Sequence, residues 1–305
     1  MKRSGTSKTV GRVGVLLLLF AALLTAGGCN VGPVVPASGA KPARIISLTP
    51  STTEILHGVG AFDRVVAVSD YCSYPPEASK LPRVGGWNNP NMEQIAGLRP
   101  DLVIFSDAQA QFVKDKVEAA GIKTLSVPSQ TLEDAYTAIT LVGRATGDEE
   151  AAARLLEQTR ASVETVRLVT ERLPRRRVLC VVDRVPGTLR DLYTAGGESF
   201  IAQLIRVAGG EPISPPTTGG WGKMQKEAVV ALDPDVVLDL MMHKEAGSFD
   251  EDTLAVWREL PGLRAVRDGR VHALRDETVL HPSQLVGESA RKFAQLIHPE
   301  AFEKR

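Results

Sequence analysis

The sequence predicts an α/β protein in which two α/β lobes are joined by one long rigid backbone helix, with a ligand cleft between the lobes. Three observations predict this fold. Short β-like runs alternate with helical stretches in both halves of the chain, as expected for mainly parallel sheets. A helical stretch without Gly or Pro, residues 148–173, lies between the halves. An internal repeat then places the same segment once in each half.

The composition is that of a globular protein and excludes several functional classes. The chain has 305 residues, enough for one large or two medium domains, with 43% apolar and 24% charged residues. Lys and Arg number 36, as do Asp and Glu, so the zero net charge gives no support to nucleic-acid binding. Three cysteines are too few for a disulfide scaffold.

The first 28 residues predict a secretory signal peptide. A basic start precedes the apolar run Val13–Leu24, which as a helix rises only ~18 Å, too short for the ~30 Å hydrocarbon core of a bilayer. Small residues then precede Cys29, and this order resembles a bacterial lipoprotein signal, in which the cysteine is lipidated. The alternative is ordinary cleavage nearby, with Cys29 uninvolved. Removal of residues 1–28 leaves an exported chain with net charge −4.

The elements of the N-terminal lobe follow a linker. Residues 29–43 contain Cys29, the expected lipidation site, and three prolines among small residues, which indicates a linker. The N-terminal lobe is expected over 44–147. Its strands are expected at 44–48, Val65–Val68, Leu102–Phe105 and Thr124–Val127, and its helices include Gln111–Ala120 and Leu132–Thr146. Ser51 and Glu54 have the spacing of a capping box, which predicts a structural role for Glu54.

The inter-lobe helix is expected over 148–174 and the C-terminal lobe over 175–305. Apolar residues recur at helical intervals through 148–173, which as a helix makes a rod of ~39 Å. Such a rod limits large hinge opening, and the alternative is a long surface helix within one domain. The C-terminal lobe is expected to contain strands Val178–Val182, Val236–Leu240 and Val271–Leu274, and helices Ser199–Ala208 and Gln284–Ile297.

The most informative feature is the internal repeat. Residues 85–104 and 219–238 align without a gap at an offset of 134, and each segment holds Gly-Gly-Trp, a glutamate, Pro-Asp and an apolar strand. A βα unit needs the strand and the Pro-Asp helix stop for its fold. The fold does not require Trp87 and Trp221 on glycine-rich loops, or Glu93 and Glu227 on both helices. We therefore interpret the two tryptophans and the two glutamates as functional pairs.

Aromatic residues in both lobes favour a broad, planar ligand. Trp87 and Trp221 offer large flat rings, and a cleft between lobes is a common place for such a site. Tyr71 follows the strand Val65–Val68, and loops at the carboxyl ends of strands bind ligands in open α/β sheets, so Tyr71 is expected to join Trp87. Tyr74 is expected to pack on the two following prolines. For Trp221, core packing is the competing interpretation.

The two glutamates indicate a docking surface. If a pseudo-twofold relates the lobes, Glu93 and Glu227 present two separated carboxylates to arginines of a roughly twofold-symmetric partner. For a single glutamate, the simpler interpretation is a solvated side chain near a helix N-terminus, worth only ~0.3–1 kcal/mol. The matched pair favours docking.

A further set of motifs runs through most of the chain: 44–54, Tyr74-Pro-Pro-Glu-Ala78, Val84-Gly-Gly-Trp87, Asn91-Met-Glu93, 98–104 and His298-Pro-Glu300. On these motifs, the chain from Arg44 to Glu300 resembles the substrate-binding proteins of bacterial ABC importers for cobalamin, ferric siderophores and haem, the class with a helical backbone between its lobes. The tyrosine loop, and the tryptophan ahead of the Met-Glu helix, most resemble the cobalamin-binding branch.

The resemblance implies a non-enzymatic receptor. Tyr71 and Trp87 would contact the corrin ring of cobalamin, while Glu93 and Glu227 would dock on permease arginines. A monomer tethered through lipid on Cys29, in the periplasm or at the cell exterior, would deliver the corrinoid to an ABC permease dimer with a cytosolic ATPase. Cobalamin would be the transported ligand, and no cofactor is expected.

Two alternatives stay open. Within the same family, the ligand would be a ferric siderophore or haem, and Tyr71 or Cys72 would then be an axial haem ligand. A lone cysteine more often packs, as is expected of Cys180 in its strand. The alternative of a different class is an exported α/β hydrolase-type enzyme. No Gly-x-Ser-x-Gly, His-Glu-x-x-His, Walker A or Gly-x-Gly-x-x-Gly motif occurs, and the five histidines lack metal-ligand spacing, which favours a binding protein.

Overall fold

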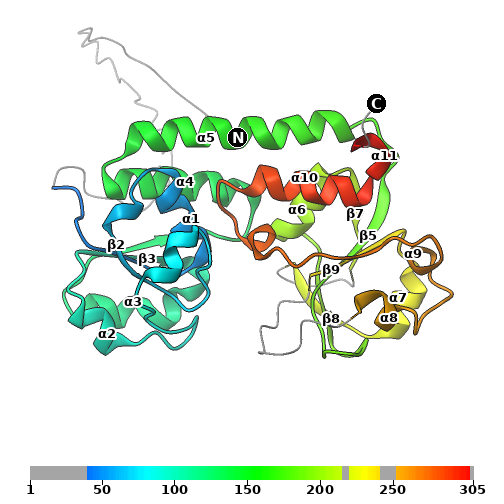
Figure 1. Cartoon of the computed structure of the whole chain (residues 1–305), viewed down its shortest axis with the longest axis horizontal. Helices are drawn as coiled ribbons and strands as arrows, with labels where there is room; N and C mark the ends of the chain where they lie inside the picture. Colours follow the sequence, from blue (N-terminus) through cyan, green and yellow to red (C-terminus); the bar gives the residue numbers. More distant parts are fainter. Residues whose placement is uncertain (1–39, 215–219, 241–251, 303–305) are drawn as a thin grey trace, which may run out of the picture. The chain divides into compact units, whose positions relative to one another are not determined.

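Two separate sheets organise the part of the chain that the structure, a computed structural model, describes: residues 40–214, 220–240 and 252–302 (Figure 1). The expected signal peptide, Cys29 and Gly219 of the second Gly-Gly-Trp lie outside the described residues. Among the described helices, none has both the length and the apolar character needed to cross a bilayer.

The first sheet is wholly parallel and has the strand order β2-β1-β3-β4. Its strands are nearly those predicted: β1 (Ile45–Ser47), β2 (Val65–Val68), β3 (Leu102–Ser106) and β4 (Thr124–Val127). Alternate side chains enter two apolar clusters, one on each face, which explains the unbroken apolar runs. Helices α1 (Pro50–Gly58) and α4 (Leu132–Thr146) cover one face, and α2 (Met92–Gly97) and α3 (Ala110–Ala119) the other.

The second sheet is mixed, which the sequence analysis did not predict. The order β10-β9-β5-β6-β8 contains the three predicted strands β5 (Arg176–Asp183), β9 (Val236–Asp239) and β10 (Val271–Ala273), which are parallel. Strand β6 (Leu192–Ala195) pairs antiparallel with β5, and β8 (Trp221–Met224) pairs antiparallel with β6. Strand β7 (Gly210–Pro212) pairs parallel with β5. The helices of this half are α6 (Phe200–Val207), α7 (Lys226–Leu232), α8 (Thr253–Trp257), α9 (Arg264–Arg267), α10 (Val286–Ile297) and α11 (Pro299–Phe302).

The long helix α5 (Glu149–Thr170) confirms the helix expected between the two sheets, and its 22 residues fall inside the predicted range. Figure 1 shows α5 alongside α4 and α10, and it packs against both. Glycines permit the close approach. A Cβ at Gly143 of α4 would lie 2.2 Å from Ala152 Cβ, and one at Gly287 of α10 would lie 1.8 Å from Ser162 Oγ. Helix α5 therefore contacts elements on both sides of it in the sequence.

The two halves also share an apolar core, which periodicity alone did not predict. Tyr136 of α4 and Val166 of α5 belong to the same buried cluster as Phe200 of α6 and Phe293 of α10. Burial of such side chains contributes about 1.5–3 kcal/mol each relative to exposure. The halves are thus joined by packed side chains as well as by α5.

The capping box expected at Ser51 and Glu54 does not form. Helix α1 begins at Pro50, its N-cap is Thr49, two residues before the expected N-cap Ser51, and no side chain caps it. Glu54 lies in the middle of the helix, and its carboxylate contacts His281 and Ser283 instead. The capping-box prediction was therefore wrong, and the side-chain partners of Glu54 are distant in the sequence.

Candidate ligand site and docking helices

The internal repeat builds the same hydrogen-bonded clasp in each half. In the first half, the Asp101 carboxylate accepts the N–H groups of Ala43 (2.7 Å) and Arg44 (3.0 Å), and the Asp101 N–H donates to the Arg44 carbonyl. The Arg44 guanidinium donates to the carbonyl of Leu98, at the end of α2, at 2.7 and 3.0 Å. The clasp, formed by Arg44, Leu98 and Asp101, ties the end of α2 to the start of β1.

The clasp of the second half consists of Arg177, Leu232 and Asp235. Asp235 exchanges two hydrogen bonds with the Arg177 backbone, at 2.8 and 2.9 Å, and the Arg177 guanidinium donates to Leu232 O at 2.6 Å. Burial raises the pKa of Asp235, but the hydrogen bonds from Arg177 and Arg264 outweigh it and leave the pKa below its usual value. Leu232 and Asp235 stand 134 positions after Leu98 and Asp101. The Pro-Asp pairs of the repeat therefore have a shared structural role.

Backbone conformation repeats at the same offset. Arg99 (φ 48°) and Asp233 (φ 43°) are both left-handed, which is uncommon for residues other than glycine. Each follows the end of its helix and turns the chain toward β3 or β9. The clasps and these turns give α2 and α7 equivalent positions on their own sheets.

Glu93 and Glu227 occupy equivalent positions as a result. Each lies in the first turn of its helix, α2 or α7, and each is exposed. Within the described residues, neither carboxylate forms a hydrogen bond or salt bridge. Val230, one turn after Glu227, is also exposed, at 51%. Two unpaired carboxylates on matched helices are available for charge-assisted contacts with a partner.

Tyr71 and Trp87 lie on neighbouring loops at the carboxyl end of the first sheet. Tyr71 is 53% exposed and Trp87 is 37% exposed. A Cβ added at Gly86 would lie 3.5 Å from the Tyr71 ring, so the ring rests against the Trp87 loop. The Asp70 N–H donates to Gly85 O at 3.0 Å and joins the two loops. The structure thus brings Tyr71 and Trp87 together, and we call them the first aromatic wall.

Gln109 was missed by the sequence analysis although it fixes the Trp87 loop. Its side-chain amide donates to Trp87 O at 2.8 Å, and the residue is fully buried just after β3. Tyr74 was expected to pack on Pro75 and Pro76. The structure places its half-buried ring edge-on against His57, with ring centroids 5.5 Å apart, and burial raises its pKa.

Trp221 stacks on Tyr193, a residue that the sequence analysis missed. Their rings are nearly parallel, at 9°, with centroids 6.1 Å apart, and Tyr193 is 38% exposed. Trp221 is half-buried and also packs against the apolar cluster shared by the two halves, so the core interpretation was partly right. We call Tyr193 and Trp221 the second aromatic wall. The alternation in Leu-Tyr-Thr-Ala was the available signal for β6, which carries Tyr193.

The structure explains why the residue before Trp221 in the second Gly-Gly-Trp, Gly220, is a glycine. Its φ is +78°, and a Cβ would lie 2.8 Å from the backbone N of Ser199, the N-cap of α6. Gly220 O accepts the Gly196 N–H at 2.9 Å. Glycine is therefore required where the chain enters β8.

The cysteines of the described region are buried and do not suit an axial-ligand role. Cys72 has no exposed surface, and the Thr53 hydroxyl donates to its Sγ at 3.1 Å. Burial raises the pKa of Cys72, and likewise that of Cys180 in β5. Both thiols stay protonated at neutral pH, so the structure gives no support to thiolate ligation by Cys72. Cys180 is in the core, as expected.

The third tryptophan, Trp257, is structural. It is fully buried, and its indole N–H donates to Asp239 Oδ2 at 2.8 Å. Arg184 Nε donates to the same oxygen at 2.9 Å, and both members of this ion pair are buried. Across the described residues, no group of three or more His, Cys, Asp or Glu side chains is placed to hold a metal ion.

Sequence comparisons place the chain among known binding proteins. A family described as periplasmic binding protein matches residues 45–278. An uncharacterized ABC transporter substrate-binding lipoprotein, YvrC of Bacillus subtilis (strain 168), is 28% identical over 271 residues, covering 87% of this chain and 82% of that protein. A vitamin B12-binding protein of Yersinia pestis (strain Pestoides F) is 30% identical over 204 residues, covering 67% and 70%.

Solved structures share the fold. The vitamin B12-binding protein BtuF of Vibrio cholerae has a TM-score of 0.72 at 23% identity, covering 87% of this chain and 99% of that chain. The haem-binding protein RhuT from Roseiflexus sp. RS-1, in its apo form, has a TM-score of 0.73 at 24% identity, covering 85% and 98%. At these identities the likeness shows the fold alone, and it confirms the predicted two-lobe α/β class.

Proposed function

The chain belongs to the periplasmic binding protein family, and on this premise we propose that it is the exported substrate-binding protein of an ABC importer with cobalamin as its transported ligand. The observation that carries the proposal is the first aromatic wall, where Tyr71 and Trp87 expose flat rings on adjoining loops at the carboxyl end of a parallel sheet. The name of the Yersinia relative, a vitamin B12-binding protein, supports this ligand.

The two aromatic walls suit a corrin ring. Stacked and edge contacts of aromatic side chains favour broad apolar faces, and rings with few rotatable bonds lose little entropy on binding. Tyr71 and Trp87 would contact the ligand from the first half, and Trp221 with Tyr193 from the second, across a cleft between the halves. Gln109 would keep the Trp87 loop in place when the ligand binds.

Haem is the second candidate, because the same walls suit any planar metal macrocycle and haem-binding proteins are among the structural neighbours. A ferric siderophore, the third member of the expected ligand class, is less planar and would contact the aromatic rings over a smaller area. The named relatives are binding proteins, which fits a non-enzymatic role and gives no support to the hydrolase alternative.

Docking would use Glu93 and Glu227. The clasps hold α2 and α7 in equivalent places, so the two exposed carboxylates would meet equivalent arginines on the two subunits of a permease dimer. A cytosolic ATPase bound to that permease would drive import. The binding protein itself would act as a monomer and would need no cofactor.

The N-terminal segments would tether the protein at the outer face of the cytoplasmic membrane. Residues 1–28 would direct export, Cys29 would carry the lipid, and the rest of 29–43 would be the linker to the folded part. The B. subtilis relative is named a lipoprotein, which supports this arrangement. The lobes would then span 44–147 and 175–305, on either side of a backbone helix in 148–174.

Calorimetric titration with cyanocobalamin, haem and a ferric hydroxamate siderophore tests the ligand. We expect saturable one-to-one binding of cyanocobalamin and much weaker binding of the siderophore. Binding of haem alone would keep the importer role and change the cargo. If none of the three binds, the proposed ligand class is wrong.

A further inference from the structure

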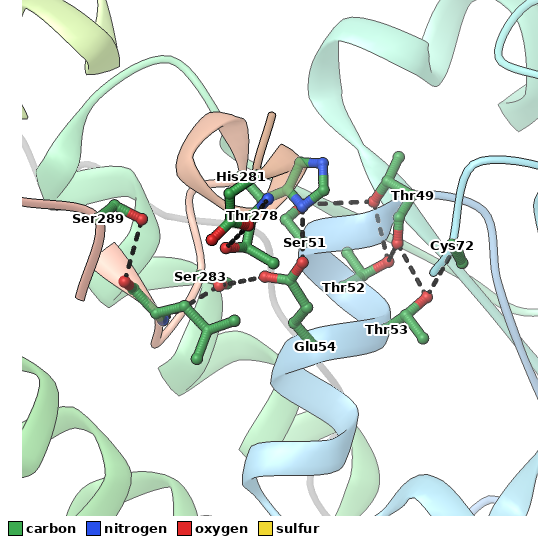
Figure 2. Close-up of polar contacts among 12 residues, drawn as sticks. Thr49, Ser51, Thr52, Thr53, Glu54, Cys72, Thr278, His281, Ser283 and Ser289 are labelled. Atoms are coloured by element: carbon green, nitrogen blue, oxygen red, sulfur yellow. Dashed lines mark hydrogen bonds and ion pairs between the residues drawn. The ribbon is translucent and has the colours of Figure 1, made fainter. Parts of the chain in front are cut away.

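A buried polar cluster joins α1 to the segment 281–284, and no role above uses it (Figure 2). His281 Nδ1 lies 2.6 Å from Glu54 Oε1, and the Ser283 hydroxyl donates to Glu54 Oε2 at 2.5 Å. The Gln284 side-chain amide donates to the Glu54 carbonyl at 2.8 Å. Glu54 is 1% exposed, and Ser283 is fully buried. These contacts hold the His281 ring in one orientation.

Glu54 also determines which nitrogen of the His281 ring is free. A carboxylate only accepts hydrogen bonds, so Nδ1 carries the hydrogen and the lone pair of the neutral ring is on Nε2. Within the described residues, Nε2 has no hydrogen-bond partner, and the side chain keeps 13% of its surface exposed. Carboxylate–histidine pairs of this kind orient imidazoles that bind metals in proteins.

His298 is a structural histidine of this chain, and its surroundings differ from those of His281. Its side chain has no exposed surface, its Nε2 lies 3.1 Å from Gly209 O, and its Nδ1 lies 3.3 Å from Glu300 Oε1. Both ring nitrogens of His298 are engaged. In His281 only Nδ1 is engaged, and part of the ring reaches solvent.

The chain of contacts around Glu54 leads to the first aromatic wall. Helix α1 follows β1 at the carboxyl edge of the first sheet, the edge from which the Tyr71 loop also leaves β2. Thr53, next to Glu54, donates to Cys72 Sγ, and Cys72 follows Tyr71. Two neighbouring residues of α1 thus contact His281 of the second half and Cys72, the residue after Tyr71.

We propose that His281 Nε2 is an axial ligand for the metal of the transported macrocycle, with Glu54 as its positioning residue. The proposal rests on the proposed function, because the aromatic walls select the planar macrocycle. Imidazole is an established ligand for haem iron and other transition metals. The metal–oxygen bond to a bound water breaks, a metal–Nε2 bond forms and the water leaves, with no change of oxidation state.

Absorption spectra of the full-length chain in detergent test this assignment. Aquocobalamin and haem each carry an exchangeable axial position, and cyanocobalamin, with its tightly bound cyanide, is the matched probe. On binding to the wild type, aquocobalamin or haem is expected to change from a water-ligated to a nitrogen-ligated absorption spectrum. His281→Ala and His281→Gln are expected to bind at least 10-fold more weakly and to keep the water-ligated spectrum, which added imidazole converts. Glu54→Gln should shift the spectrum only in part. His57→Ala, an exposed histidine on α1, should match the wild type.

Each outcome decides between the assignment and the broader function. If the wild type binds a macrocycle and its water-ligated spectrum persists, the His281 assignment is overturned and the proposed function stands, and no variant needs to fold for that result. Equal spectra and affinities in wild type and His281→Gln would likewise overturn the His281 assignment and leave the proposed function standing. If the wild type binds no macrocycle at all, both proposals are overturned.

Discussion

Asp101 and Asp235 make the same pair of backbone hydrogen bonds, one in each half of the chain. Each donates its N–H to the carbonyl of an arginine, Arg44 or Arg177, and each accepts the N–H of that arginine through its carboxylate. In both halves the arginine guanidinium then binds the end of the helix that carries a glutamate of the repeat. This equivalence is the structural basis for treating Glu93 and Glu227 as one docking pair.

Loss of both docking glutamates should stop transport without affecting capture. Glu93→Ala combined with Glu227→Ala is expected to abolish cobalamin uptake in cells and to change the dissociation constant of cyanocobalamin less than twofold, because the exposed carboxylates lie on helices outside the aromatic walls. Uptake of labelled cobalamin and calorimetry measure the two effects. Glu150→Ala with Glu157→Ala, two exposed glutamates of α5, is the control. A large loss of affinity in the double variant would show that the glutamates belong to the ligand site.

Removal of Trp87 should weaken ligand binding. Trp87→Ala is expected to cost ~1–3 kcal/mol of binding free energy, by analogy with stacking on aromatic platforms. Calorimetry with cyanocobalamin measures the loss, and Leu168→Ala, an exposed apolar residue of α5, is the control. Unchanged affinity in Trp87→Ala would remove this residue from the site.

The two clasps should contribute to stability in parallel. Asp235→Ala leaves the Arg177 N–H without its carboxylate partner and is expected to lower the free energy of unfolding by about 1–2 kcal/mol. Asp101→Ala should also lower the free energy of unfolding, but by a smaller amount, because Asp101 is more exposed than Asp235. Urea denaturation measures both, with the exposed Asp115→Ala as the control. An Asp235 variant as stable as the control would show that the clasp does not stabilise the fold.

Asp148, at the start of α5, should make stability depend on pH in the acid range. Burial raises its pKa, but Lys41, Thr146 and Arg64 together lower the pKa below its ordinary 3.8. The folded state therefore binds fewer protons than the unfolded state, so the contribution of Asp148 to stability is present above about pH 3.8 and is lost as the pH falls through the lower folded pKa.

The pH dependence of Asp148→Asn provides the measurement. Wild type should be more stable than the variant at pH 6, and the difference should shrink below pH 4, as followed by urea denaturation at each pH. A constant difference between pH 6 and pH 2 would show that the ionisation of Asp148 does not stabilise the fold.

Local sequence patterns predicted most of the parallel elements because these elements depend on local burial. Strands such as Val65–Val68 and Thr124–Val127 are short apolar runs covered on both faces, and α4 has its predicted bounds because Thr131 caps it and Gly147 ends it. Strands β6 and β8 were missed because both are short and depend on pairing with other strands: β6 pairs with β5 and β8, and β8 pairs with β6.

The candidate site was predictable only where the repeat marked it. The repeat singled out Trp87, Trp221 and both glutamates. The alternation around Tyr193 indicates only a strand, because the stacking partner of Tyr193 lies on a different strand. The contact between Glu54 and His281 joins residues 227 positions apart, so the capping-box spacing around Glu54 pointed to the wrong partner. Such contacts depend on how the halves pack, which short-range periodicity does not encode.

A crystal structure with cyanocobalamin would locate the ligand relative to the aromatic walls. We expect one corrinoid between the halves, with its ring contacted by Tyr71 and Trp87 on one side and by Trp221 and Tyr193 on the other. A corrinoid bound away from both aromatic walls, or no bound corrinoid at saturating concentration, would contradict capture by these residues.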